Sequence, residues 1–230
     1  MSNNAPENVR RLIDLLKPKT VLDRELIRVG SPNDGGYVML KPRETQKKRQ
    51  ALSFGIGYDW SWDEVMARDY NYEIFMCDDG DCDAVLPGCW FSKVKLDGYV
   101  VNHLFQTYKF KDIIWKMDVE GSEWGIFHRI KDEYLEQCEQ ILLELHFTCD
   151  YHAWIPILEK INKTHQSFMV QPNNCQGKQE YDDFDFAAYV EVSFVRRKDH
   201  QFAPYDHSKV LPLLGLNVPE HEPVTLNWVK

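Results

Sequence analysis

Short apolar runs alternate with helix-type patterns through the middle of the chain, and no other feature limits the fold as strongly. The expected strands are residues 51–54, 72–77, 90–96, 113–117, 140–145, 168–170 and 187–195, and the expected helices are residues 60–69, 99–108, 123–134 and 153–163. Apolar strands separated by single helices are typical of βαβ units, in which helices cover both faces of a parallel sheet. We therefore expect an α/β, Rossmann-like fold with a mostly parallel, doubly wound sheet.

Shorter segments precede and follow this pattern. Apolar residues recur at helical spacing before Pro18, which predicts an amphipathic helix over residues 7–17. Residues 26–29 and 37–40 flank a turn rich in Gly, Asn and Asp and predict a hairpin. The predicted organisation is an N-terminal helix and hairpin extension (1–49), a cofactor-binding domain (50–200) and a non-helical, proline-containing tail (201–230) that is a candidate contact for a second copy or a neighbouring domain.

Composition excludes some classes of partner. The chain has 27 Lys and Arg against 36 Asp and Glu, a net charge of −9, and its longest basic run is Lys47-Lys48-Arg49. Nucleic-acid binding by counterion release needs a basic surface, so we expect no nucleic-acid partner. No stretch approaches the roughly 18 uninterrupted apolar residues of a membrane span, and no signal-peptide core is visible, so we expect no membrane span and a cytoplasmic location.

Two strand ends carry residues typical of nucleoside binding. Ligands of a doubly wound sheet bind at the carboxyl ends of its strands. The first of these strands leads into Gly55-Ile56-Gly57 and then Asp59 before a helix, so backbone can approach a ligand beside a helix N-terminus. The second ends at Asp78, and 78 − 57 = 21 residues is the separation at which an acid reaches ribose hydroxyls. These residues predict a nucleotide or nucleoside cofactor.

The glycine motif is incomplete for a dinucleotide. Trp60 stands where a third glycine would approach pyrophosphate, which disfavours an NAD-dependent oxidoreductase. S-adenosylmethionine has a ribose and a base but no phosphates, so it fits the shorter motif. A protein that binds a cofactor or a partner without catalysis remains an alternative, because fold alone does not establish activity.

Acids and an imidazole end the next two strands. Glu123 is expected to complement the dipole of the following helix, but Asp118 and Glu120 would repel each other unless a cation or a donor uses them. Glu144 and His146 alternate onto the same side of their strand. We predict either that His146 is a general base oriented by Glu144 beside Asp118, or that Asp118, Glu144 and His146 bind Mg²⁺ or Mn²⁺. A structural pair of Glu144 and His146 is the third alternative.

Several short stretches between residues 28 and 147 form a recognisable set. In chain order they are Arg28-Val29-Gly30, Asp34-Gly35-Gly36-Tyr37, Ser53-Phe54-Gly55-Ile56-Gly57, Trp60-Ser61-Trp62-Asp63, Lys116–Trp124 and Leu143–Phe147. Together they resemble the FkbM-like methyltransferases, in the branch that includes eukaryotic methyltransferase-like proteins. The resemblance implies a class I methyltransferase fold, S-adenosylmethionine as donor, and O-methylation of a sugar or another hydroxyl-bearing small molecule.

The resemblance also indicates which residues meet the amino-acid end of the donor and which meet the acceptor. Many class I methyltransferases have an acid where this chain has Ser53, so we expect Asp59 or Asp118 to take the amino-acid end of the donor. On the acceptor side we expect Asp34, Tyr37, Glu120 and Trp124, since rings cover the apolar face of a sugar and carboxylates accept its hydroxyl protons.

Overall fold

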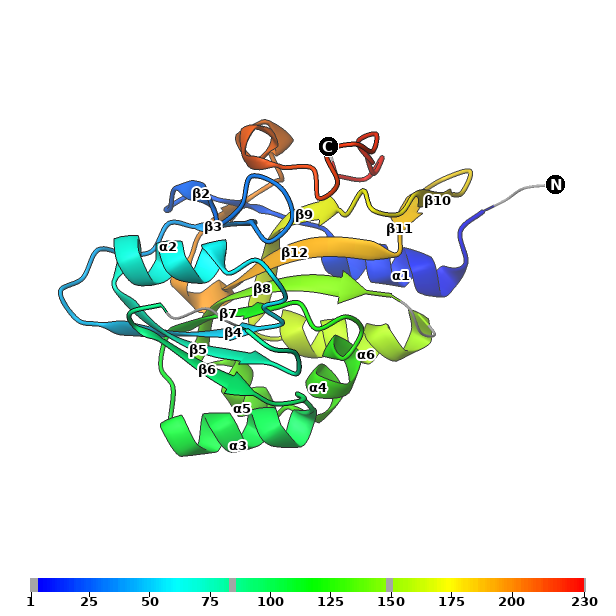
Figure 1. Cartoon of the computed structure of the whole chain (residues 1–230). Coiled ribbons are helices and arrows are strands. Elements are labelled where there is room, and N and C mark those ends of the chain that lie inside the picture. Colours follow the sequence, from blue (N-terminus) through cyan, green and yellow to red (C-terminus); the bar gives the residue numbers. More distant parts are fainter. Residues whose placement is uncertain (1–3, 83–85, 148–150, 230) are drawn as a thin grey trace.

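A seven-stranded sheet forms the centre of the computed structural model, which describes residues 4–82, 86–147 and 151–229 (Figure 1). The strands lie in the order β6-β5-β4-β7-β8-β12-β9. Their bounds are β4 Arg49–Phe54, β5 Tyr72–Asp78, β6 Cys89–Lys93, β7 Ile113–Met117, β8 Cys138–His146, β9 His165–Pro172 and β12 Tyr189–Arg196. β4 to β8 pair in parallel, while β12 is antiparallel to both of its neighbours. The predicted Rossmann-like, mostly parallel sheet is confirmed.

Helices cover both faces of the sheet. One face carries α1 (Glu7–Leu16), α3 (Gly98–Tyr108), α4 (Glu123–Arg129), α5 (Asp132–Leu135) and α6 (Tyr151–Asn162), which share a large apolar core with the strands (Figure 1). The opposite face carries α2 (Ser61–Tyr70) and the antiparallel hairpin of β2 (Leu26–Val29) and β3 (Tyr37–Leu40). Side chains alternate along β4 accordingly, so that Leu52 packs in the first core and Ala51 in the second.

The single helix predicted over residues 123–134 is wrong, because the chain turns between α4 and α5. Ile130 and Lys131 adopt extended ψ angles of 141° and 142°. The ammonium of Lys160, from α6, bonds the carbonyls of Phe127 and Ile130, and Asn102 accepts from the amide of Lys131. Side chains distant in sequence therefore replace the backbone bonds that a continuous helix would make.

Three further differences concern the smaller elements. β1 (Thr20–Val21) pairs with β13 (Phe202–Ala203). β10 (Lys178–Glu180) pairs with β11 (Asp185–Ala187) in a short hairpin, so Ala187 belongs to this hairpin and the expected 187–195 strand begins at Tyr189 instead. The tail contains two single-turn 3₁₀ helices, so it is not wholly non-helical. No helix of the described residues has the length and apolar character to cross a bilayer.

The tail packs on the sheet edge and on the hairpin. Val210 lies in an apolar cluster with Val38 of β3 and Phe168 of β9. Gln171 donates to the carbonyl of Gly215, a glycine whose Cβ would lie 2.2 Å from the carbonyl oxygen of Pro32 in the hairpin turn. The last segment is therefore held by both β9 and the β2–β3 turn.

Gly55 is the position where backbone geometry is tightest. Its φ is +70°, and a Cβ there would lie 1.4 Å from the carbonyl oxygen of Asp118. Gly57 has a φ of +55° but open space around it. Gly55→Ala should lower the free energy of unfolding by about 3–5 kcal/mol, through clash and left-handed strain, and Gly57→Ala by about 1–2 kcal/mol, through strain alone. Urea denaturation measures both, and equal losses would contradict the role given to the Gly55–Asp118 contact.

Candidate functional site

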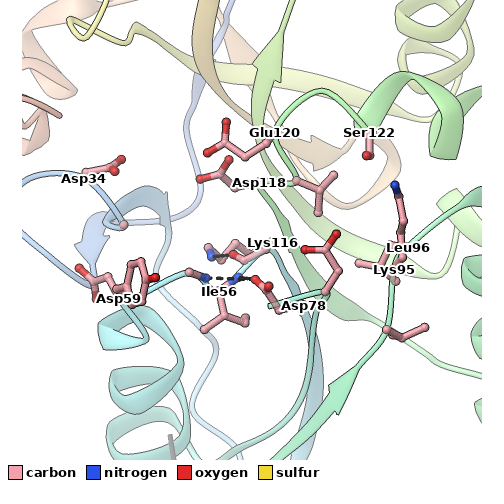
Figure 2. A pocket seen from close by; sticks show the side chains of 17 residues that line it. Asp34, Ile56, Asp59, Asp78, Lys95, Leu96, Lys116, Asp118, Glu120 and Ser122 are labelled. Carbon is pink, nitrogen blue, oxygen red and sulfur yellow. Dashed lines mark hydrogen bonds between the residues drawn. The ribbon is translucent and has the colours of Figure 1, made fainter. Parts of the chain in front are cut away.

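A cavity of about 740 Å³ opens at the carboxyl ends of β4, β5 and β7 (Figure 2). Its wall comes from the loops that follow β4 to β7 and from the turn of the β2–β3 hairpin. The predicted site residues in this wall are Asp34, Gly55, Ile56, Gly57, Asp59, Asp78, Asp118 and Glu120. The strand order reverses between β4 and β7, which is where a doubly wound sheet binds its ligand.

Asp78 fastens the glycine loop. Its Oδ2 accepts from the amides of Ile56 at 2.6 Å and Gly57 at 3.1 Å, and its Oδ1 accepts from the amide of Gly80 at 2.7 Å. Burial alone would raise the pKa of Asp78, but these bonds outweigh it and the pKa lies below its ordinary value. Because a carboxylate has about four acceptor positions, Asp78 can still meet a ligand, and Asp79 beside it also lines the cavity.

The hairpin turn meets the start of α2 at the cavity. Asp59 accepts from the amide of Ser61 at 2.7 Å, and a Cβ on Gly35 would lie 2.8 Å from Asp59 Oδ2. Asp34 lies in the wall, where its Oδ1 accepts from Asn217 of the tail at 3.2 Å. Tyr37 is buried behind the wall and its hydroxyl donates to Asp118 Oδ2 at 3.3 Å.

Asp118 and Glu144 form a buried carboxyl pair. Their side chains are hydrogen-bonded to each other, and Asn173 donates to Glu144. Burial, then Asp118, then Glu191 raise the pKa of Glu144 to about 10, and burial also raises the pKa of Asp118. Two adjacent buried carboxylates repel, so at neutral pH one proton remains, and we assign it to Glu144. Glu144 is then a neutral donor to Asp118.

His146 has other partners than the sequence predicted. Its Nδ1 lies 3.2 Å from Glu123 Oε1 and its Nε2 lies 3.3 Å from Glu120 Oε2. Glu123 is fully buried and also accepts from the amide of Val119. The predicted orientation of the ring by Glu144 is therefore wrong, and Glu123 does more than complement a helix dipole. Burial alone would lower the pKa of His146, but Glu123, Asp118 and Glu120 outweigh it and raise the pKa.

One group of side chains in the described part of the chain has metal-ligand spacing. The ligand atoms of Asp118, Glu120 and His146 lie within 4.8 Å of one another. Glu120, rather than the predicted Glu144, completes this set. Glu123 behind His146 supplies the second carboxylate that commonly fixes the ring of a metal-bound histidine. Glu120 has a φ of 52°, a left-handed conformation that is uncommon outside glycine.

Trp124 and the segment after β6 differ in their relation to the cavity. Trp124 lies outside the wall, stacks on His128 and donates to the carbonyl of Ala153. Val94 and Leu96 give the wall apolar surface after β6. No helix lies between β5 and β6 in the described part of residues 79–88, so β5 leads to β6 through a loop there.

Sequence reasoning missed two charged residues around the glycine loop. Lys116 lines the cavity and donates to the carbonyl of Gly55 at 2.8 Å. Lys116 lies two residues before Asp118, near the end of β7, and this spacing was a usable signal because alternate side chains along an extended chain share a face. Asp63 of α2 is fully buried, and burial raises its pKa to about 6. A carboxylate in the first turn of a helix ordinarily complements the helix dipole, so Asp63 carries no signal of burial in the sequence.

Known proteins are similar to this chain in structure but not in sequence. The sequence matches no protein-family model and no curated protein. Bluetongue virus VP4, described as a multifunctional RNA-capping production line, is similar in structure at a TM-score of 0.38 and 12% identity, over 89% of this chain and 36% of that chain. The MycE methyltransferase from the mycinamycin biosynthetic pathway, solved with Mg and SAH, gives a TM-score of 0.34 and 13% identity, over 72% of this chain and 48% of that chain.

The chain thus spans about a third of VP4 and about half of MycE. Structural likeness at this level does not show an activity. Membership of the FkbM-like group stays a prediction from the sequence resemblance.

Glu144→Gln tests the proton assigned to the carboxyl pair. The folded pKa of Glu144, about 10, lies above the ordinary value of 4.5, so its stability contribution is present below pH 4.5 and is lost as pH rises toward 10. The amide keeps a neutral donor and removes this loss. Urea unfolding at several pH values should show the variant more stable than wild type at pH 9 and similar at pH 5. The exposed Glu133→Gln is the control, and parallel curves for Glu144→Gln and wild type would contradict the assignment.

Proposed function

We propose that the protein is an S-adenosylmethionine-dependent O-methyltransferase that acts on a hydroxyl of a sugar or another small molecule. The observation that carries this proposal is the single cavity wall that joins the glycine loop and Asp78 at one side to the Asp118, Glu120 and His146 group at the other. The sheet, with one antiparallel strand inserted beside a parallel set, agrees with the class I fold that the sequence resemblance implies.

The donor fits the cavity with its adenosine toward β5 and β6. Asp78 and Asp79 suit the ribose hydroxyls, and Val94 and Leu96 suit the flat face of adenine. The methionine part then extends along the loop after β4 toward Asp118. This direction places the sulfonium methyl on the side where an acceptor, entering beside Asp34 and Glu120, can reach it.

The charge of the wall favours this donor over a dinucleotide. Two lysines, Lys95 and Lys116, face six carboxylates in the wall: Asp34, Asp59, Asp78, Asp79, Asp118 and Glu120. The sulfonium of S-adenosylmethionine is cationic, whereas the pyrophosphate of NAD carries two negative charges. Electrostatic complementarity therefore supports the sulfonium donor and disfavours the oxidoreductase alternative.

Methyl transfer requires the acceptor oxygen to attack the methyl carbon as the carbon–sulfur bond breaks, and the hydroxyl proton to pass to water or to a basic side chain. Asp118, Glu120 and His146 would hold a Mg²⁺ or Mn²⁺ ion, whose chemistry is to lower the pKa of a bound hydroxyl. Glu123 on Nδ1 directs Nε2 of His146 toward this group. Tyr37 and the protonated Glu144 hold the carboxylate of Asp118 in place. Trp124, outside the wall, has no part in this proposal.

Calorimetry with S-adenosylhomocysteine and NAD⁺ tests the cofactor class. We expect one S-adenosylhomocysteine molecule to bind per chain, with no heat from NAD⁺, because the acidic wall repels pyrophosphate. Asp78→Ala should abolish or strongly weaken this binding, since it releases the glycine loop, while the exposed Glu133→Gln should leave it unchanged. Binding of NAD⁺ without S-adenosylhomocysteine would contradict the proposal.

A methyl-transfer screen against a glycan panel, read as S-adenosylhomocysteine formed, tests the reaction. His146→Ala should lower turnover by about 10²-fold or more with donor affinity unchanged. Dialysis against a chelator should abolish activity, and Mg²⁺ or Mn²⁺ should restore it. Full activity after exhaustive chelation would exclude the metal and leave His146 as a general base.

A further inference from the structure

Lys116 is a buried cation at the floor of the cavity. Its residue is only 2% exposed, and in Figure 2 it lies between Asp118 and Ile56. Its Nζ donates to the carbonyl of Gly55 at 2.8 Å and lies 5.5 Å from the ring centroid of Tyr37. An ammonium has three N–H donors, and the bond to Gly55 is the one that it makes within the described residues.

The acids around Lys116 act on it from a distance. Its charge favours the ionised forms of Asp63, Asp78 and Asp118, against the effect of burial on each of them. None of the described carboxylates forms an ion pair with its Nζ within 4.0 Å, in contrast to Lys93, which lies 2.6 Å from Asp81. A buried cation without a contacting anion is costly, and the same cation can hold an anion that enters the cavity.

S-adenosylmethionine carries one such anion. Its α-carboxylate must enter a wall that holds six carboxylates and two lysines. Of the two lysines, Lys95 is exposed and follows β6, on the adenosine side, whereas Lys116 is buried on β7 beside the glycine loop. The methionine part of the donor extends toward β7 in the proposed placement, and Lys116 is the cation on that side.

We propose that Lys116 binds the α-carboxylate of the methionine part of the donor through its remaining N–H groups. This inference rests on the proposed function. It complements Asp59 as the partner of the donor ammonium, because Asp118 belongs to the proposed metal-binding group, so that the two charges of the amino-acid end meet opposite charges. Lys116 then has two roles, one bond to the Gly55 carbonyl that shapes the loop and one ion pair with the donor.

A pair of ligands separates this role from simple neutralisation of buried acids. S-adenosylhomocysteine and its decarboxylated analogue share the adenosine, the sulfur and the amine and differ in the carboxylate. Wild-type protein should bind the decarboxylated analogue about 10- to 100-fold more weakly, the loss expected for a charge-assisted hydrogen bond. Lys116→Met should weaken the binding of S-adenosylhomocysteine by a similar factor and leave the affinity for the decarboxylated analogue within about threefold of wild type. The preference for the ligand with the carboxylate then disappears.

Lys95→Met is the matched control, because it removes a positive charge from the same wall and should keep the preference. Lys116→Gln serves as a second variant if Lys116→Met does not fold, as judged by circular dichroism. A wild-type protein that binds both ligands equally, or a Lys116 variant that keeps the wild-type preference, would overturn the inference. A wild-type protein that binds neither ligand nor 5′-methylthioadenosine would instead contradict the proposed function.

Discussion

Contact between the backbone of Gly55 and that of Asp118 sets the distance between the glycine loop after β4 and the acidic loop after β7. The amide of Asp118 donates to the carbonyl of Phe54 at 2.9 Å, and the next residue, Gly55, has no room for a side chain against the Asp118 carbonyl. The glycine loop after β4 and the acidic loop after β7 are therefore held as one unit. Lys116 reinforces this unit with its bond to the Gly55 carbonyl, and Asp78 fastens the other side of the same loop.

Buried charge is concentrated in this unit and along the strands behind it. Glu191 of β12 stands directly opposite Glu144 of β8, and burial raises the pKa of Glu191 to about 7. Asn217 of the tail donates to both Glu191 and Asp34. A row of carboxyls thus runs from the cavity to the tail, and it is stable because several members hold protons or accept side-chain bonds. Through Asn217, the tail therefore holds Asp34 of the cavity wall without lining the cavity itself.

The alternation of apolar residues along strands and their helical spacing elsewhere were sufficient to predict the sheet and the hairpin. The convergence of Gly55, Asp78 and Asp118 on one edge was also predictable, because the carboxyl ends of parallel strands meet there. Partners made across the sheet were not predictable. The pairing of His146 with Glu123 depends on how the loop after β7 folds back onto β8. The break after Arg129 depends on the bond from Lys160 to the carbonyl of Ile130, a residue thirty positions earlier in the chain. Such contacts follow from tertiary packing, which a single sequence does not encode in its periodicity.

A crystal structure with S-adenosylhomocysteine would show how the donor lies in the cavity. We expect the ribose to lie against Asp78 and Asp79, the homocysteine carboxylate to contact Lys116, and the sulfur to face the group of Asp118, Glu120 and His146. A ligand bound in the reverse direction, with adenine toward Asp118, or bound outside this cavity, would contradict this placement.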